Sequence, residues 1–303
     1  MTLTELRYVV ALARTRHFGQ AAEQCHVSQP TLSVAVRKLE DDLDVRLFER
    51  QRNDVLVTAA GAEIIAQAER VLRAADGVRE IAAAARDPLG GLLTLGVIYT
   101  VGPYLVPRLI GGLKQLAPNM ALVVKENFTE ALATQLRDGE IDAAIMSLPY
   151  ACPQLLSRPL YDEPFHIALP AAHRLARKKR LSAADLADET LLLLGARHCF
   201  RDQVLEICHL RPAGSGLQKT LESSSLDTIC QMVAMGAGVT IVPATMRIND
   251  DLAAHLLIRP FAAPRPLRTI AVFYRRGFAR PQVIQCLARV VRAAKLRGVE
   301  YCA

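Results

Sequence analysis

The sequence has no long run of hydrophobic residues, although 51% of its 303 residues are hydrophobic. A membrane-spanning helix needs about 20 consecutive apolar residues, and the longest apolar stretches here are far shorter. The amino terminus, Met1-Thr-Leu-Thr-Glu-Leu-Arg7, also lacks the charged and then apolar segments of a signal peptide. We therefore expect a cytoplasmic protein with no membrane partner, long enough for two or three domains.

The sequence also lacks a pattern of cysteines that would form a scaffold. Its seven cysteines are odd in number, scattered, and include no Cys-x-x-Cys pair. This excludes a disulfide framework and a structural zinc site, and we expect no metal and no cofactor. We interpret five of the cysteines as core, helix, loop or tail residues without chemistry, namely Cys25, Cys152, Cys230, Cys286 and Cys302.

An excess of positive charge in the first domain is absent as well. The whole chain has a net charge of +7, but residues 1–90 contain 12 Lys and Arg against 13 Asp and Glu, a balance of −1. Residues 91–303 contain the remaining 25 against 17, a balance of +8. Bulk charge is therefore no argument for DNA binding, which has to be argued from individual basic groups.

Two of the cysteines stand out, in the segment Ala196-Arg-His-Cys-Phe-Arg-Asp-Gln-Val-Leu-Glu-Ile-Cys208. Residues 200–208 are predicted to form a short helix, which places Cys199 at or near its amino terminus. Unpaired backbone N–H groups and the positive end of the helix dipole favour a thiolate there, and His198, Arg197 and Arg201 add donors and charge. The alternative is that Cys199 is a half-buried small hydrophobic residue and Cys208 a core residue.

The spacing of Cys199 and Cys208 carries a second inference. In one continuous helix, nine residues correspond to about 13 Å of rise and roughly half a turn of azimuth. A disulfide requires Cα atoms within about 7 Å. Either the two cysteines never bond, or the helix must melt for them to bond, and oxidation would then act as a conformational switch.

The first ninety residues show helical periodicity and little strand character. A short helix is predicted to begin at Gln20, and a second one covers Thr31 to Glu40 after a tight turn. Ser28 is a suitable N-cap for the second helix and Pro30 lies in its first turn. This is a helix-turn-helix, whose second helix can enter a major groove.

Three stretches of this region carry a specific resemblance: Phe18-Gly-Gln-Ala-Ala-Glu-Gln-Cys-His-Val-Ser-Gln-Pro-Thr-Leu-Ser33, Lys38-Leu-Glu-Asp-Asp-Leu-Asp-Val-Arg-Leu-Phe-Glu-Arg50 and Thr58-Ala-Ala-Gly61. They resemble the DNA-binding domain of LysR-type transcriptional regulators. The resemblance implies an all-α winged helix-turn-helix that binds double-stranded DNA. It places eight residues at the DNA: Ser28, Gln29, Pro30, Thr31, Ser33 and Arg37 at the groove, and Arg50 and Arg52 in a wing over residues 48–57.

The chemistry of these residues suits that role. Gln29 can read adenine edges, Thr31 and Ser33 can contact phosphates or a thymine methyl group, and arginines neutralise phosphates. For each of these residues, a solvated surface position is the alternative.

Residues 58–86 are predicted to form one long helix. Apolar residues recur at spacings of four and three: Ile64, Ala68, Val71, Ala75, Val78, Ala82 and Ala85. This heptad pattern is typical of a helix that pairs with another, and nothing in the chain itself is expected to cover it. We therefore expect a homodimer through residues 59–86 whose two DNA-binding domains read a two-fold related site, with a hinge before residue 91.

After residue 91 the pattern alternates between strands and helices, which predicts an α/β domain with mostly parallel sheets. Strands are expected at residues 92–97, 122–126, 143–146, 165–169, 190–194, 217–221, 239–242 and 269–274. The segments Leu136-Arg-Asp-Gly-Glu-Ile-Asp-Ala-Ala-Ile145 and Met235-Gly-Ala-Gly-Val-Thr-Ile-Val-Pro243 resemble the regulatory domain of the same family.

The resemblance implies two periplasmic-binding-protein-like lobes. The expected organisation is a DNA-binding domain (1–58), a dimerisation helix and hinge (59–90) and a two-lobed regulatory domain (91–303). Lobe I comprises residues 91–163 and 268–303, and lobe II comprises residues 164–267. The resemblance also implies RNA polymerase as a partner and pairing of dimers into a homotetramer.

Ligands of such sheets bind beyond the carboxyl ends of the strands. Hydroxyl groups are expected there at Thr100, at Thr129 and at the three serines of residues 223–225, with helix capping as the alternative. The segment from His198 to Cys208 resembles the peroxide-sensing members of the family. This resemblance implies that Cys199 is the peroxidatic residue and Cys208 the resolving one. It also implies a peroxide pocket formed by Thr100, Thr129, His198, Asp202 and Arg268.

Three functions compete at this point. The leading hypothesis is a transcriptional activator of oxidative-stress defence genes, in which peroxide oxidises Cys199 and a disulfide forms with Cys208. The second is a LysR-type regulator that responds to a small metabolite between its lobes, with both cysteines incidental. The third, a peroxidase enzyme, fits poorly because catalytic turnover gains nothing from operator binding.

Overall fold

The computed structural model describes residues 1–50, 54–208, 222–223, 225–246 and 250–302. The chain forms two compact units, residues 1–85 and residues 86–303. Each unit has its own buried core and is described here separately. Within the described residues, no helix combines the length and the apolar character needed to cross a membrane.

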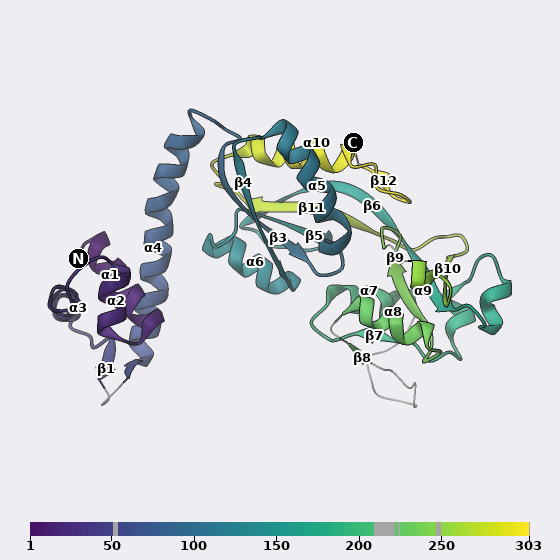
Figure 1. Cartoon of the computed structure of the whole chain (residues 1–303), viewed down its shortest axis with the longest axis horizontal. Helices are drawn as coiled ribbons and strands as arrows, with labels where there is room; N and C mark the ends of the chain where they lie inside the picture. Colours follow the sequence, from purple (N-terminus) through teal and green to yellow (C-terminus); the bar gives the residue numbers. More distant parts are fainter. Residues whose placement is uncertain (51–53, 209–221, 224, 247–249, 303) are drawn as a thin grey trace. The chain divides into compact units, whose positions relative to one another are not determined.

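The first unit is a winged helix-turn-helix (Figure 1). Its helices begin at side-chain caps: Thr2 and Glu5 form a capping box, His17 accepts hydrogen bonds from two backbone N–H groups, and Ser28 accepts one from Thr31. Leu12, Leu32 and Leu39 are fully buried between the helices. The elements are α1 (Leu3–Thr15), α2 (Phe18–Gln24), α3 (Gln29–Leu43) and an antiparallel wing of β1 (Phe48–Arg50) and β2 (Val55–Val57).

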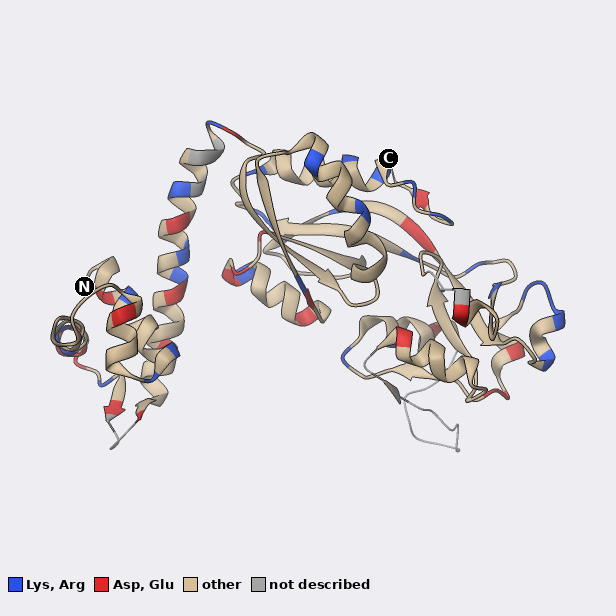
Figure 2. Ribbon diagram, viewed as in Figure 1, with Lys and Arg blue, Asp and Glu red and all other residues tan. Residues whose placement is uncertain are grey.

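Helix α4 (Ala59–Ala84) corrects one expectation. Its apolar stripe is not uncovered along its whole length, because Ala68 is buried in the core of the first unit and Ile64 and Val71 pack against that core. Further along, Val78 is 66% exposed and Ile81 is 60% exposed. The first half of the stripe is apolar because it packs on the chain's own helices. Only the second half, which includes Val78, is free to pair with another chain. Charges of both signs follow one another along α4 (Figure 2).

Lobe I of the second unit is a sheet covered by helices. Strands β3 (Gly91–Ile98), β4 (Met120–Asn127) and β5 (Ala143–Leu148) are parallel. Figure 1 shows α5 (Gly102–Leu116) and α10 (Pro281–Ala293) on one side of the sheet and α6 (Thr129–Asp138) on the other. Strand β12 (Glu300–Tyr301) is added near the carboxyl terminus.

The prediction of mostly parallel sheets is wrong. The 16-residue strand β6 (Leu155–Pro170) is antiparallel to β11 (Leu267–Arg275), β9 (Thr240–Pro243), β10 (Leu256–Pro260) and β12, and β11 is antiparallel to β5. The reason is topological. The chain leaves lobe I along β6 and returns along β11, so these two connecting strands must run in opposite directions.

Lobe II is built around the second half of β6. It contains β9, β10 and the short parallel pair β7 (Leu193–Leu194) and β8 (Glu222–Ser223). Its helices are α7 (Cys199–Ile207), α8 (Leu226–Ala234) and α9 (Asp250–Ala253), with 3-10 turns at Arg174–Arg177 and Ala183–Leu186. Strand β10 was not expected from the sequence, and the strand expected at residues 217–221 lies outside the described residues.

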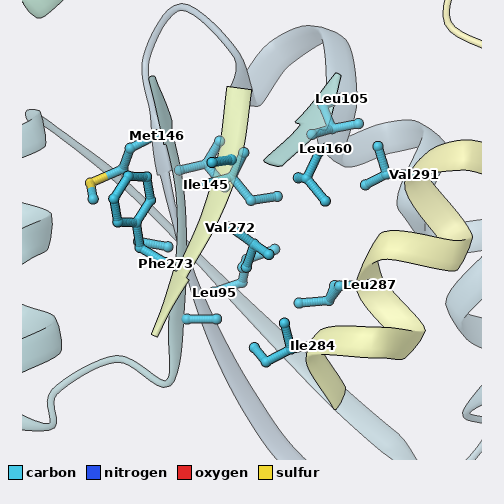
Figure 3. Packing of buried hydrophobic residues seen from close by; sticks show 14 of the residues in the cluster. Leu95, Leu105, Ile145, Met146, Leu160, Val272, Phe273, Ile284, Leu287 and Val291 are labelled. Atoms are coloured by element: carbon cyan, nitrogen blue, oxygen red, sulfur yellow. The ribbon is translucent and has the colours of Figure 1, made fainter. Parts of the chain in front are cut away.

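The two lobes have separate hydrophobic cores, which confirms the two-lobed fold class. In lobe I, Val272 faces α10, while its neighbour Phe273 points with Met146 to the opposite face of the sheet (Figure 3). Helices α5 and α10 pack closely, because a Cβ atom on Gly112 would lie 2.6 Å from Val290. Full burial of each large apolar side chain contributes about 1.5–3 kcal/mol, so each lobe has a substantial core of its own.

Candidate functional site

Cys199 and Cys208 lie at opposite ends of one helix. Helix α7 begins at Cys199, with His198 as its N-cap residue, and ends at Ile207, with Cys208 as its C-cap residue. Both cysteines are free thiols. The predicted helix is therefore present, and nine residues of helix separate the two Cα atoms by about 13 Å of rise. The pair cannot form a disulfide in this conformation.

The two thiols belong to different cores. Cys199 packs against the core of lobe I, although α7 itself belongs to lobe II. Cys208 packs against the core of lobe II, and burial raises the pKa of the Cys208 thiol to about 11. Cys208 is therefore a protonated, poorly nucleophilic thiol at neutral pH in this conformation.

A small pocket lies beside Cys199, between residues of the two lobes. Its volume is about 10 Å³, which is space for about one water-sized molecule. Lobe I contributes the residues that follow the carboxyl ends of β3 and β4, and lobe II contributes the start of α7. The lining residues are Ile98, Tyr99, Thr100, Asn127, Phe128, Thr129, His198, Cys199 and Phe200.

Thr129 has an unsatisfied hydroxyl group at this pocket. It is the first residue of α6, it is 8% exposed, and its Oγ1 atom has no hydrogen-bond partner among the described residues. Buried hydroxyl groups are usually hydrogen-bonded, so an orphaned one at a pocket points to a ligand. Helix capping, the alternative for this residue, does not occupy its side chain.

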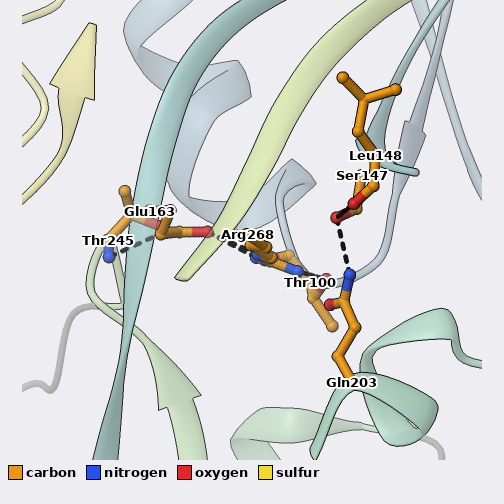
Figure 4. A network of polar contacts seen from close by, with 7 residues as sticks. All are labelled: Thr100, Ser147, Leu148, Glu163, Gln203, Thr245 and Arg268. Atoms are coloured by element: carbon orange, nitrogen blue, oxygen red, sulfur yellow. Dashed lines mark hydrogen bonds and ion pairs between the residues drawn. The ribbon is translucent and has the colours of Figure 1, made fainter. Parts of the chain in front are cut away.

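Thr100 is held by Arg268. The Nη1 atom of Arg268 donates to Thr100 Oγ1 at 2.8 Å, and Nη2 donates to the Thr100 carbonyl oxygen at 3.1 Å. On its other side Arg268 pairs with Glu163 (Figure 4). Arg268 is buried but is not among the residues that line the pocket. Arg268, which was expected in the pocket, therefore reaches it only through Thr100, which it contacts directly.

His198 joins an aromatic cluster across the lobes. Its ring centroid lies 4.8 Å from that of Phe128 and 5.7 Å from that of Tyr99. The Arg197 guanidinium lies 4.4 Å from the centroid of the Phe128 ring, and Arg201 donates to the Leu194 carbonyl oxygen. Arg197 is thus stacked on Phe128, and Arg201 is tied to the end of β7.

Asp202 and the predicted serines occupy other positions. Asp202 is exposed on the first turn of α7 and does not line the pocket. Ser225 caps α8 by accepting from the Thr228 backbone, which confirms the capping alternative for this serine. Ser223 lies on β8 and accepts from the Ser225 backbone instead. Residue 224 lies outside the described residues.

Sequence reasoning missed Gln203. Its Nε2 atom donates to Ser147 Oγ on β5 at 2.9 Å and so ties α7 to lobe I. No local sequence pattern predicts this contact, because Gln203 and Ser147 are 56 positions apart.

Helix α3 presents a polar face to solvent. Gln29, Pro30, Thr31 and Arg37 are exposed, while Ser33 is partly buried. Ser28 and Thr31 also hydrogen-bond to each other at 2.7 Å, so both serve the helix start. Arg52 and the side chain of Arg50 lie outside what the structure describes.

Sequence reasoning also missed Val34, which is 68% exposed on α3. A valine exposed on a groove-entering helix is suited to a thymine methyl group. Within the described part of the chain, no three His, Cys, Asp or Glu side chains are grouped to hold a metal ion.

Family comparisons agree with both units. The model of bacterial regulatory helix-turn-helix proteins of the LysR family matches residues 3–62. The model of the LysR substrate binding domain matches residues 86–295. The chain belongs to the LysR family. It is a DNA-binding transcription regulator rather than an enzyme.

Individual relatives narrow the comparison. The chain is 39% identical over 293 residues to the DNA-binding transcriptional dual regulator OxyR of Escherichia coli strain K12, covering 97% of this chain and 95% of that one. It is 40% identical to the hydrogen peroxide-inducible genes activator of Pectobacterium carotovorum over 277 residues, 91% of each chain. The structure of full-length OxyR from Pseudomonas aeruginosa matches with a TM-score of 0.77 and 48% identity, covering 99% of this chain and 97% of that one.

Proposed function

We propose that this chain is a cytoplasmic transcriptional activator of oxidative-stress defence genes that senses hydrogen peroxide through Cys199. The support comes from two directions. Relatives that match nearly the whole chain are named hydrogen peroxide-inducible genes activators. The site independently combines a thiol at a helix start, two threonine hydroxyl groups and a histidine around a pocket for a very small molecule.

The pocket at Cys199 carries the proposal. Its 10 Å³ volume suits a molecule of peroxide size, whereas sites for metabolites occupy about 300–1,000 Å³. The unpartnered Thr129 hydroxyl offers a hydrogen-bonding group to a molecule in this space. The metabolite-sensing alternative therefore has no comparable site at Cys199.

The first chemical step is a two-electron oxidation of Cys199. The thiolate attacks one peroxide oxygen, the O–O bond breaks, and the sulfur becomes a sulfenic acid. The second oxygen leaves as hydroxide and takes up a proton to form water. Hydrogen bonds from Thr100 and Thr129 stabilise the charge that develops on the leaving oxygen.

The second step joins Cys199 to Cys208. The Cys208 thiolate attacks the sulfur of the sulfenic acid, an S–S bond forms, and hydroxide leaves and is protonated to water. This step requires Cys208 to leave the core of lobe II and α7 to melt, since the helix holds the two sulfurs apart. Closing so short a loop contributes only about 3 kcal/mol, which suits a reversible link.

The output is a change in DNA binding. Residues of α3 read the operator and the arginines neutralise phosphates. Residues 59–86 form the dimer, with Val78 and Ile81 as the exposed apolar positions on α4. Dimers pair into a homotetramer, and RNA polymerase is the partner in activation.

Peptide mapping after one equivalent of hydrogen peroxide tests the proposal. We expect the peptides that contain Cys199 and Cys208 to become linked, with consumption of one peroxide per chain. Failure of these peptides to link would contradict the sensing mechanism. Continued peroxide consumption in the presence of a thiol reductant would instead support the enzyme alternative.

A further inference from the structure

A buried ion pair lies where the chain passes between the lobes. Glu163 on β6 and Arg268 on β11 are cross-strand partners and are 0% and 2% exposed. The Glu163 Oε2 atom lies 2.8 Å from Nε and 2.7 Å from Nη2 of Arg268. A buried ion pair is often no more stabilising than apolar residues of the same volume. The pair therefore calls for an explanation other than stability.

Both partners reach beyond the pair, in opposite directions. The other oxygen of Glu163, Oε1, accepts hydrogen bonds from the backbone N–H of Thr245 at 3.0 Å and from its hydroxyl group. Arg268 donates to the hydroxyl and carbonyl oxygens of Thr100. Figure 4 shows the resulting row from Thr245 through Glu163 and Arg268 to Thr100. It connects the turn after β9 in lobe II with the pocket beside Cys199.

The polarity of this row determines what Thr100 can do. A threonine hydroxyl group has one proton and two lone pairs. Since Thr100 Oγ1 accepts from the Arg268 guanidinium, its proton is available to another acceptor, and the residue lines the pocket. The guanidinium keeps this orientation because Glu163 holds two of its three nitrogens.

From this geometry we infer that Glu163 is a positioning residue for peroxide reduction. Through Arg268 it orients the Thr100 hydroxyl as a donor to the leaving oxygen of the peroxide. The inference rests on the proposed function and assigns a role to a residue that does not touch the pocket. When the O–O bond breaks, the Thr100 hydroxyl donates a hydrogen bond to the departing hydroxide and keeps its own proton. Solvent supplies the proton that converts the hydroxide to water.

The test compares two reagents for the same thiol. In a Cys208→Ser background, the rate of Cys199 oxidation by hydrogen peroxide and the rate of its alkylation by iodoacetamide are followed by mass spectrometry. Glu163→Gln should slow oxidation by roughly a hundredfold, because a misplaced donor costs that much. Alkylation should be unchanged, since iodide leaves without a proton from Thr100.

A matched control is Glu189→Gln, which removes another ion-paired glutamate. Glu189 lies in lobe II, contacts Arg174 and is not among the residues that line the pocket. It should change neither rate. Equal slowing of both reactions in Glu163→Gln would indicate a purely structural role and overturn the inference.

The pathway through Thr100 is tested by a double-mutant cycle. In a Thr100→Val background, Glu163→Gln should produce no further slowing by peroxide. Additional slowing would show that Glu163 acts by another route, for example by aiming Arg268 at the peroxide itself, and would overturn the inference.

Because loss of a buried ion-pair partner destabilises the fold, Thr245→Val provides a milder test. It removes one donor to Glu163 and should slow oxidation by about tenfold with alkylation unchanged. An unchanged ratio of the two rates would contradict the inference. A parent protein whose Cys199 reacts with peroxide no faster than free cysteine would instead refute the proposed function.

Discussion

The two ends of α7 differ in what surrounds them. At the amino-terminal end, Cys199 lies against lobe I beside a small pocket with an unsatisfied hydroxyl group. At the carboxyl-terminal end, Cys208 is packed among the apolar residues of lobe II, and its pKa is raised to about 11. Cys199 thus lies beside a small pocket, whereas Cys208 is shielded by apolar side chains.

This difference explains how one short helix can keep the thiols of Cys199 and Cys208 apart. Proximity along the chain would bring the thiols together in an unfolded segment within about 10–100 ns. The intact helix prevents that, and the two cores hold its ends. In the proposed mechanism, oxidation of Cys199 would change the size and polarity of a group between the lobes, and the packing at this end of α7 would be disturbed first.

The largest effect is expected from replacing Cys199, the thiol at the amino-terminal end of α7. Cys199→Ser should abolish the peroxide response and leave operator binding intact, because the DNA-binding domain folds as a separate unit. Promoter activation and gel-shift assays with and without peroxide measure this. A Cys199→Ser protein that still activates under peroxide would remove the distinction between the two ends.

Replacing Cys208, the buried thiol at the carboxyl-terminal end of α7, should have the next largest effect. Cys208→Ser should leave the oxidation of Cys199 in place but stop the reaction at the sulfenic acid, which a dimedone probe detects by mass spectrometry. No intramolecular disulfide should form. If a disulfide to Cys199 still appears within the chain, Cys208 is not the resolving residue.

The polar character of the first end is tested by Thr129→Val. This change removes the orphaned hydroxyl group at nearly constant volume, and we expect oxidation by peroxide to slow by roughly a hundredfold. Stopped-flow measurement of the second-order rate constant checks it. Thr134→Val, on the outward part of the same helix α6, is the control and should react like the parent chain.

A change in the DNA-binding domain should separate sensing from output. Arg37→Ala should weaken operator binding by about 1 kcal/mol and reduce the salt slope by about one if Arg37 contacts a phosphate. The reactivity of both cysteines should be unchanged. Fluorescence anisotropy over a range of salt concentrations measures the slope, and an identical slope would place Arg37 away from the phosphates.

The smallest expected effect is a pH dependence of the stability of the fold that arises from Cys208. Burial raises the pKa of Cys208, so the folded state holds the thiol proton more tightly than the unfolded chain does. The stability this contributes is complete below about pH 9 and is lost as the pH rises towards 11. In a Cys199→Ser background, the Tm of the chain should therefore fall relative to a Cys208→Val variant between pH 9 and 11. A constant difference would show that Cys208 is not shielded.

Local sequence signals account for much of the molecule. The Ser28 cap and the Pro30 position predicted the second helix of the helix-turn-helix, and the pattern of residues 200–208 predicted the helix α7. Thr100 and Thr129 were expected beyond the carboxyl ends of neighbouring parallel strands, which meet at one sheet edge, and the family resemblance assigned both to one pocket, which both of them line. Such signals work over a few residues, where backbone geometry decides.

Other features depend on contacts between distant segments. The antiparallel course of β6 and β11 follows from the passage of the chain between lobes, which no hydrophobic pattern records. The apolar stripe predicted helix α4 correctly but did not show what packs against it. Packing on the chain's own core and packing on a second chain produce the same periodicity.

The sequence by itself therefore determined the helix-turn-helix and the helix that separates Cys199 from Cys208. Only the tertiary structure decided that Cys199 joins the core of lobe I while Cys208 joins that of lobe II. It also decided that Arg268 holds Thr100 and is itself held by Glu163, 105 positions away. The physical reason is that hydrogen bonds and burial depend on distance in space, whereas caps, turns and helical periods depend on neighbours along the chain.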